Sequence, residues 1–245
     1  MSSIFDQINC KDHAEFVEKS ADIIASSIQK SITGRGECLL CLSGGKTPCP
    51  VYTEIGKRKD IDWQKVSIFL CDERYVPRDH TMSNQKLIHK TLLRHDQLLV
   101  GSSQFPNTSL PLEHCIADYA ARIKTLWHNH STDIAILGMG IDGHTASLFP
   151  PLSDAELGDE KLVLHTTTHQ FAVHDRITLS LNALAASRHC IVLLTGEKKR
   201  HIWEEMMYSN EDERRWPMKR ILEICDVTVV TDWEGEFYTQ LISKK

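Results

Sequence analysis

The stretch that most constrains the fold runs over residues 133–150, with the sequence DIAILGMGIDGHTASLFP. Its apolar run at 134–137 is typical of a strand that is buried on both faces of a parallel sheet. Gly138, Gly140 and Gly143 follow closely, so the chain must turn abruptly where this strand ends. In an open parallel sheet, ligands bind at the carboxyl ends of the strands. We therefore expect an α/β fold with this turn at the binding edge.

Two polar residues on this turn, Asp142 and His144, supply a carboxylate and an imidazole. An imidazole ionises near neutral pH and is a common general base. The three glycines formally fit a dinucleotide fingerprint, but His144 follows the third glycine directly and two prolines follow at 150–151, which leaves little room for the long helix of that motif. The residue types leave two interpretations open, a catalytic site and a structural loop.

Apolar runs predict six further strands, at 38–42, 66–70, 161–165, 176–180, 190–196 and 226–230. Helical periodicity predicts helices at 12–33, 48–58, 83–94, 113–128, 181–187, from 197 onward, and at 233–242. We expect a connection at 96–112 and an acidic surface loop at 154–160. This order predicts a Rossmann-like, mostly parallel sheet with helices on both faces, in a single domain over residues 1–245.

Composition narrows the class of protein. The 33 acidic and 28 basic residues give a net charge of −5, which argues against binding to nucleic acid or to an anionic membrane. The chain begins without the basic and apolar regions of a signal peptide and has no apolar stretch of spanning length, so we expect a cytoplasmic protein.

Eight cysteines are scattered along the chain, and only Cys38 and Cys41 have the spacing of a redox or metal motif. If they lie on a strand, its period of two directs their thiols to opposite faces. No second pair supplies the remaining ligands of a zinc site. We therefore expect buried free thiols and no metal.

The turn at Ser43–Pro48 (SGGKTP) lies between a predicted strand and a predicted helix. Free backbone N–H groups and a helix dipole favour a phosphate at such a place, although a plain turn is the alternative. The strand ends at 42–47, 71–75, 138–144 and 195–199 should converge at one edge of the sheet. That edge would suit an anionic substrate because of the side chains it carries: Lys46, Arg74, Asp142, His144 and Lys199.

Six blocks of this sequence together resemble the 6-phosphogluconolactonase family, within the larger group that includes glucosamine-6-phosphate deaminases. They are LSGGKTP at 42–48, DERYVP at 72–77 with SNQ at 83–85, GMGIDGHTASLFP at 138–150, RITL at 176–179, GEKK at 196–199 and PMKRIL at 217–222. Three places depart from the family pattern: Lys46, Ile141 and residues 173–175.

The resemblance implies hydrolysis of 6-phospho-D-glucono-1,5-lactone to 6-phospho-D-gluconate, the second step of the oxidative pentose phosphate pathway, without metal or organic cofactor. One imidazole, which we assign to His144, can activate water and then protonate the departing ring oxygen. Asp142 would orient the imidazole or the water, while Arg74 and turn N–H groups would stabilise the oxyanion. The resemblance places the phosphate at Gly44, Gly45, Lys46, Arg176 and Lys199, and we add Ser43, Thr47 and Asp72 to the substrate-binding set.

Two other functions are considered. A deaminase-like sugar-phosphate isomerase would need the carboxylate that ends the relatives' central block, where this chain has Phe149, and a tyrosine where it has Arg74. A non-catalytic sugar-phosphate sensor would keep the fold and bind without turnover. In each case we expect a small-molecule partner and a monomer or homodimer.

Overall fold

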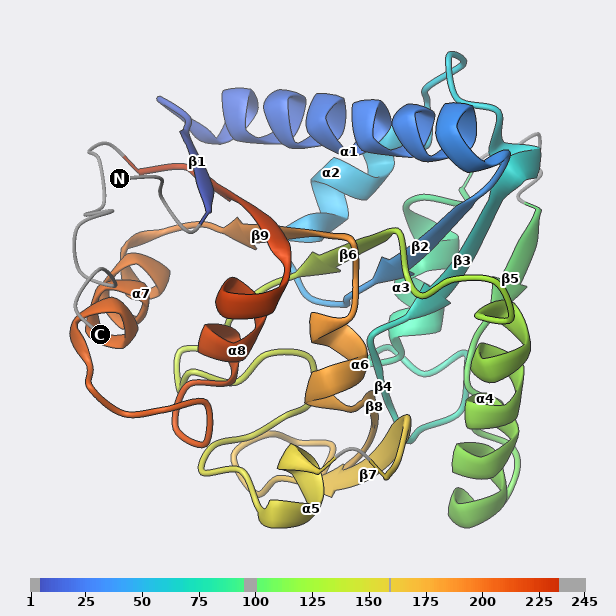
Figure 1. The fold of residues 1–245 in the computed structure, drawn as a ribbon, viewed down its shortest axis with the longest axis vertical. Helices are drawn as coiled ribbons and strands as arrows, with labels where there is room; N and C mark the ends of the chain where they lie inside the picture. The colour runs from blue at the N-terminus through green and yellow to red at the C-terminus, as the bar shows by residue number, and fades with distance from the viewer. Residues whose placement is uncertain (1–4, 95–100, 159, 234–245) are drawn as a thin grey trace.

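A computed structural model describes residues 5–94, 101–158 and 160–233. In these ranges seven strands form one sheet with the order β1-β10-β9-β6-β2-β3-β5, and all neighbours in it are parallel (Figure 1). The strands are β1 (Asp6–Asn9), β2 (Cys38–Leu42), β3 (Val66–Leu70), β5 (Ser102–Gln104), β6 (Ile134–Leu137), β9 (His189–Leu194) and β10 (Asp226–Thr231). The predicted α/β, mostly parallel fold is confirmed.

Strand β6 lies in the middle of this sheet, between β2 and β9. All four of its residues are buried, as the apolar run predicted. Leu40 of β2 and His189 of β9 both align with Ile134, so β6 is paired along both of its edges. The central strand therefore has a fixed register on each side, and its carboxyl end has a fixed place at the edge of the sheet.

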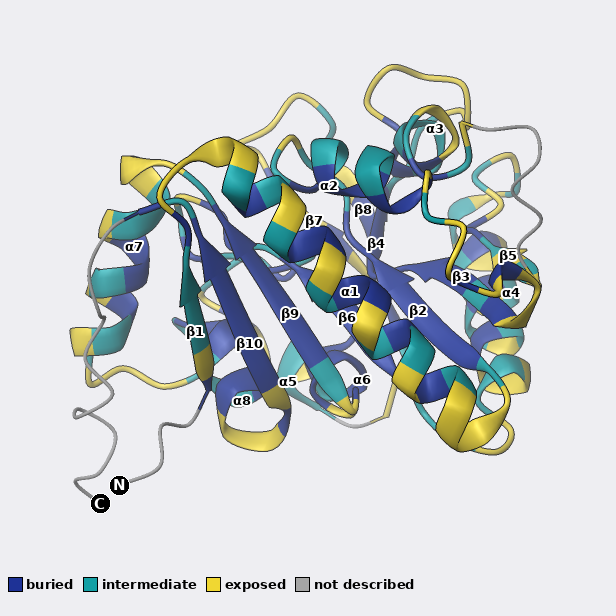
Figure 2. Cartoon of the chain, turned by 90° about the horizontal axis from the view of Figure 1, so that it is seen from above, coloured by how far each residue is buried: buried dark blue, intermediate teal, exposed yellow. Residues whose placement is uncertain are grey.

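Helices cover both faces of the sheet, and its central strands lie buried between them, whereas the edge strands β1 and β5 are only partly buried (Figure 2). One face packs against α1 (His13–Arg35), α2 (Pro48–Ile55) and α3 (Asn84–Lys90). The other packs against α4 (Leu112–Leu126), α6 (Leu181–Ala185), α7 (Glu197–Tyr208) and α8 (Pro217–Ile224). Cys38 and Cys41 of β2 belong to opposite cores, as their spacing predicted, and all eight cysteines are free thiols.

Helix α1 shows how local sequence sets the helix ends. The Asp12 carboxylate accepts a hydrogen bond from the backbone N–H of Glu15 at 2.8 Å, which satisfies a free donor of the first turn. Gly36 ends the helix in the left-handed region, at φ 83°, where a residue without a Cβ is favoured. Between these caps Phe16, Ile24 and Ile28 point into the core, which gives the helical period seen in the sequence.

A second, three-stranded sheet was not predicted. It has the order β4-β8-β7 and consists of β4 (Asp72–Arg74), β8 (Asp175–Leu179) and β7 (Val163–Thr167), all antiparallel. Strand β4 follows β3 after the single residue Cys71, so the chain leaves the large sheet at this point. The strands predicted at 161–165 and 176–180 exist with slightly shifted bounds, but they pair with β4 and do not join the parallel sheet.

Other differences from the prediction are local. The acidic segment expected as a loop begins with the short helix α5 (Asp154–Leu157), because Ser153 and Glu156 form a reciprocal capping box. Helices α2 and α3 end three and four residues before the predicted bounds at 58 and 94. Strand β1, helix α8 and the short 3-10 helix η1 (Trp63–Lys65) were not predicted. The predicted helix at 233–242 lies outside the described residues, apart from its first position.

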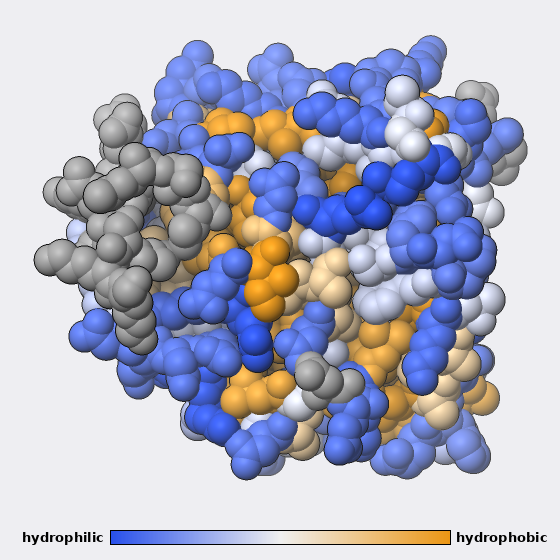
Figure 3. Space-filling view, in the orientation of Figure 1, coloured by the Kyte–Doolittle hydropathy of each residue, from blue (hydrophilic) through white to orange (hydrophobic). Residues whose placement is uncertain are grey.

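Hydrophilic side chains dominate the face seen in Figure 3 and divide its apolar side chains into separate areas. Within the described ranges, no helix has both the length and the apolar composition needed to cross a bilayer.

Asp133, which precedes β6, connects the amino end of β2, the carboxyl end of α1 and the amino end of β9. Its Oδ2 accepts a hydrogen bond from the backbone N–H of Leu39 at 2.8 Å, and its Oδ1 binds the Arg35 guanidinium at the end of α1. The backbone carbonyl of Asp133 also accepts a hydrogen bond from the N–H of His189 at 3.0 Å. A fully buried charge requires such partners, because unpaired it would destabilise the fold.

We expect Asp133→Ala to lower the free energy of unfolding by about 1–3 kcal/mol, because it leaves the buried N–H of Leu39 without an acceptor. Urea denaturation followed by circular dichroism measures this change. The matched control is Glu54→Ala, which removes an exposed ion pair with Lys57 and should cost less than about 1 kcal/mol. Equal effects of the two substitutions would contradict the role assigned to Asp133.

Candidate active site

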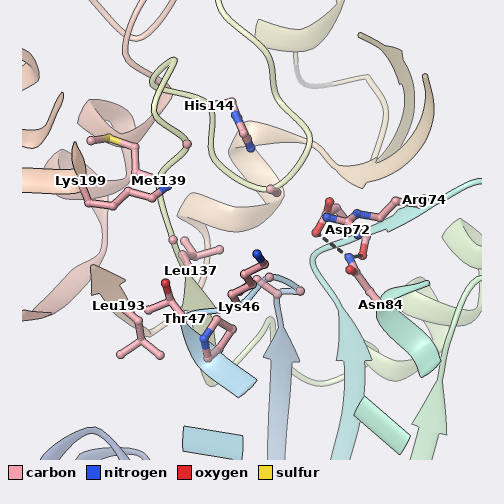
Figure 4. Close-up of a pocket in the computed structure, with 17 residues that line it drawn as sticks. Lys46, Thr47, Asp72, Arg74, Asn84, Leu137, Met139, His144, Leu193 and Lys199 are labelled. Carbon is pink, nitrogen blue, oxygen red and sulfur yellow. Dashed lines mark hydrogen bonds between the residues drawn. The ribbon is translucent and has the colours of Figure 1, made fainter. Parts of the chain in front are cut away.

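A cavity of about 270 Å³ opens at the carboxyl edge of the large sheet, where the ends of β2, β6 and β9 meet the start of β4. In Figure 4, Lys46 lies near its centre, His144 lies above it, Lys199 and Met139 lie on one side, and Asp72, Arg74 and Asn84 lie on the other. The predicted convergence of four strand ends at one edge is confirmed. Nine of the predicted site residues line the cavity, namely Ser43, Gly44, Gly45, Lys46, Thr47, Asp72, Arg74, His144 and Lys199.

The glycine turn after β6 brings its two polar side chains together. The Nδ1 atom of His144 lies 2.5 Å from Oδ1 of Asp142. The turn itself closes through a hydrogen bond of 2.7 Å from the N–H of Gly140 to the carbonyl of His144. A Cβ at position 140 would lie 2.1 Å from His144 Nδ1 and 2.3 Å from Asp142 Oδ1. Glycine is therefore required at 140, because the imidazole–carboxylate pair lies directly over this part of the backbone.

Asp142 does not itself line the cavity but lies behind His144. Burial of this carboxyl group favours its neutral form, whereas the hydrogen bond and the charge of His144 favour the carboxylate. The net effect is a pKa of Asp142 below its ordinary value. A carboxylate can only accept a hydrogen bond, so the short contact places the proton on Nδ1 of His144. The other ring nitrogen, Nε2, is then free to accept a proton.

Two phenyl rings pack against the same imidazole. The Phe149 ring centroid lies 4.9 Å from that of His144, and the Phe171 centroid lies 5.5 Å away with the rings nearly perpendicular. Phe149 comes from the segment after the glycine turn, and Phe171 from the connection between β7 and β8. Neither ring contact was predicted from the sequence, and Phe171 reaches His144 from between two strands of the unpredicted second sheet.

The turn between β2 and α2 forms the opposite wall of the cavity. Gly44 packs so closely on Asn84 that a Cβ would lie 1.9 Å from the Asn84 Oδ1 atom, and Gly45 has a φ of +104°. Among the described residues, no backbone acceptor receives a hydrogen bond from the N–H groups of Gly44, Gly45 or Lys46. Such a turn at a helix N-terminus is suited to an anion.

Lys46 and Lys199 bring positive charge to this wall. No ion pair or side-chain hydrogen bond connects either ammonium group to another residue in the described part of the chain. Burial lowers the pKa of Lys199, and the charge of Asp142 opposes this effect. A bound anion would compensate the desolvation of Lys199.

The acidic residues on the other side of the cavity already have partners. Asp72 accepts hydrogen bonds from the Ser147 hydroxyl at 2.6 Å and from the Asn84 side-chain amide at 3.3 Å. Glu73 accepts hydrogen bonds from the backbone N–H groups of Asn84 at 2.7 Å and Gln85 at 2.8 Å. Burial nevertheless raises the pKa of Glu73. The carboxylates of Asp72 and Glu73 thus have hydrogen-bond donors, and their bonds to Asn84 and Gln85 hold the start of α3 against the cavity.

Arg74 and Arg176 lie directly opposite each other on β4 and β8. Arg74 lines the cavity, and its Nη1 donates to the carbonyl of Met82 at 2.7 Å. Arg176 is 3% exposed and lies outside the cavity lining, with its guanidinium carbon 5.9 Å from the Phe149 ring and 5.7 Å from the Phe171 ring. Burial and the charge of Arg74 lower the pKa of Arg176.

Several cavity residues were missed as individual site candidates: Pro48, Asn84, Leu137, Met139, Ala146 and Leu193. Asn84 had a signal, since it lies in the SNQ block that was noted beside the charged strand end. Within the described ranges, no group of three or more His, Cys, Asp or Glu side chains is arranged to hold a metal ion.

Comparisons with known proteins agree on one family. The family model for glucosamine-6-phosphate isomerases/6-phosphogluconolactonase matches residues 11–230. A probable 6-phosphogluconolactonase of Dictyostelium discoideum is 40% identical over 217 residues, which cover 87% of this chain and 92% of the relative. A 6-phosphogluconolactonase of Thermotoga maritima is 34% identical over 185 residues, or 75% of this chain and 81% of the relative.

Solved structures give the same result. The 6-phosphogluconolactonase from Plasmodium vivax superposes with a TM-score of 0.83 at 30% identity, covering 94% of this chain and 91% of that chain. The crystal structure of the Thermotoga maritima 6-phosphogluconolactonase gives a TM-score of 0.80 at 28% identity, covering 93% of this chain and 100% of that chain.

Proposed function

The chain belongs to the glucosamine-6-phosphate isomerase/6-phosphogluconolactonase family, and from this premise we propose that it hydrolyses 6-phospho-D-glucono-1,5-lactone to 6-phospho-D-gluconate. The observation that carries the proposal is a paired imidazole, His144 with Asp142, which faces a cavity bordered by two lysine side chains and by backbone N–H groups that have no partner in the described part of the chain. These are the groups that a phosphorylated ester substrate requires.

The reaction begins with proton transfer to His144. Asp142 accepts the Nδ1–H of the imidazole, so Nε2 can take a proton from the attacking water. The resulting hydroxide oxygen bonds to the lactone carbonyl carbon, and the carbonyl oxygen becomes an oxyanion. When this intermediate collapses, the bond to the ring oxygen breaks, and the imidazolium returns its proton to that oxygen. Water is consumed, and one carboxylic acid and one alcohol are formed.

Positive groups at the cavity would stabilise the two negative centres. We assign Arg74, together with turn N–H groups, to the developing oxyanion. The phosphate would bind to Gly44, Gly45, Lys46 and Lys199, with Arg176 as a further cation behind the wall. Ser43, Thr47 and Asp72 also line the cavity and would contact the sugar or the phosphate.

The deaminase-like isomerase has less support. The position where those relatives carry a proton-transferring carboxylate holds Phe149, whose ring packs on His144. A non-catalytic sensor would bind the sugar phosphate without turnover, and an assay of lactone hydrolysis, corrected for the spontaneous reaction, separates it from the enzyme. The cytoplasmic location and the monomeric or homodimeric state stay predictions.

We expect His144→Ala to remain folded and to bind 6-phosphogluconate, yet to lose at least about 10²-fold in kcat, because a positioned base is missing. The matched control is His165→Ala, since His165 also pairs with an aspartate, Asp175, at 2.8 Å but lies outside the cavity lining. A folded His144→Ala variant with more than about a tenth of wild-type kcat would place the base elsewhere.

We expect Lys199→Ala to weaken binding of 6-phosphogluconate by about 1–3 kcal/mol, through loss of a charge-assisted contact with the phosphate, and Arg176→Ala to weaken it through loss of the positive charge behind the cavity wall. Isothermal titration calorimetry measures the affinity. Lys198→Ala is the control, because Lys198 neighbours Lys199 but is exposed and does not line the cavity. Wild-type affinity in both variants would remove these two residues from the phosphate site.

We expect activity to be independent of metal. Prolonged chelation followed by desalting should leave the rate of lactone hydrolysis unchanged. A loss of activity that added zinc restores would refute this prediction and would introduce a Lewis acid into the mechanism.

A further inference from the structure

The glycine turn that carries the His144–Asp142 pair is held from outside by a residue distant in sequence. Arg215 belongs to the connection between α7 and α8, and its Nη1 donates a hydrogen bond of 3.0 Å to the backbone carbonyl of Asp142. Residues 138–144 lie outside any helix or strand, so this contact supplements the turn's own two backbone–backbone hydrogen bonds, from Gly140 to His144 and from Gly143 to Gly140.

Arg215 is itself fixed in place. Its guanidinium carbon lies 3.7 Å from the ring centroid of Trp216, which is 1% exposed. On the other side, the carboxylate of Glu205 on α7 lies 3.9 Å from Arg215 Nη2. The backbone N–H groups of Arg215 and Trp216 both donate to the carbonyl of Asp212, at 3.2 and 2.9 Å. A planar cation held in this way offers a donor in a defined direction.

At Gly143 the turn packs directly against Arg215 and Trp216. Gly143 has a φ of +91°, and a Cβ built on it would lie 2.7 Å from Arg215 Nη1 and 2.9 Å from the Trp216 ring. The turn and the Arg215–Trp216 pair therefore meet with no room for a side chain between them. The cavity lies on the other side of the turn, since neither Arg215 nor Trp216 lines it.

We propose that Arg215 is a positioning residue for the lactone hydrolysis, because it holds the peptide plane of Asp142 and thereby the orientation of the His144–Asp142 pair. This inference rests on the proposed function. Asp142 contributes its carbonyl to Arg215 and its carboxylate to His144, so rotation of this peptide would move the carboxylate relative to Nδ1. Because Arg215 does not line the cavity, its loss should lower kcat and leave KM nearly unchanged.

Arg215→Met tests the proposal, because methionine keeps an apolar stem beside Trp216 and removes the donors. We expect kcat to fall about 10- to 100-fold, the scale that small misplacements of catalytic groups produce. The matched control is Arg214→Ala, which removes the same charge one residue earlier. Arg214 donates to the carbonyl of Leu152 at 2.5 Å and pairs with Asp154, away from the glycine turn, so its variant should retain wild-type kcat.

Two further measurements separate positioning from general loss of structure. Methylguanidinium added to an Arg215→Ala variant should restore part of kcat, since the small cation can reoccupy the place beside Trp216. In nitrogen NMR spectra, wild-type His144 should show one tautomer protonated at Nδ1, and Arg215→Met should show a mixture of tautomers. Arg214→Ala should give the wild-type spectrum.

The outcomes are distinct. Wild-type kcat in a folded Arg215→Met variant overturns the proposal, and so does an equal loss of kcat in Arg215→Met and Arg214→Ala, because the effect would then belong to the loop as a whole. If the wild-type protein does not hydrolyse the lactone, the proposed function fails. The NMR comparison then still decides whether Arg215 orients the pair, since an unchanged His144 tautomer in Arg215→Met overturns that claim.

Discussion

The position of the candidate base depends on the hydrogen bonding of β6. This strand pairs in parallel with β2 on one side and β9 on the other, and its residues are buried by helices on both faces. Its register cannot shift without breaking both ladders and exposing apolar side chains. The last residue of β6 is therefore fixed relative to the ends of its two neighbours, which carry the Ser43–Thr47 turn and the start of α7. These strand pairings therefore bring His144, Lys46 and Lys199 to the same cavity, where they could act together.

Charge at this edge is distributed unevenly. The carboxylates of Asp72 and Glu73 are satisfied by Asn84, Ser147 and backbone donors, whereas the ammonium groups of Lys46 and Lys199 face the cavity without such partners in the described structure. Of the two, Lys199 is partly desolvated, and a desolvated cation without a counter-ion raises the free energy of the folded protein. A bound phosphate would remove this cost, so binding and local stability should be coupled.

Sequence patterns located the parts of the site that depend on local order. The apolar run at 134–137 predicted β6, and the positions of the strand ends predicted which residues meet at the cavity. The patterns did not reveal contacts across long separations, such as those of Phe171 and Arg215, because periodicity carries no information about which loop packs on which. The second sheet was missed for the same reason. A three-residue strand such as β4 has too few positions to show a period, and its pairing with β8 spans about a hundred residues.

Gly140 and Gly143, which flank Asp142 in the turn, are needed for different physical reasons. One allows the His144–Asp142 pair to lie against the backbone, and the other allows Arg215 and Trp216 to do so. At Gly140 a Cβ would collide with the imidazole and carboxylate on the inner side, whereas at Gly143 it would collide with Arg215 and Trp216 on the outer side. The turn is thus closely packed at each of the two glycines. Because both positions are glycine, a guanidinium from the α7–α8 connection reaches the backbone carbonyl of Asp142, while the carboxylate of the same residue contacts His144. The Gly-x-x-Gly spacing therefore places a rigid outer support and a reactive inner pair on opposite sides of one short turn.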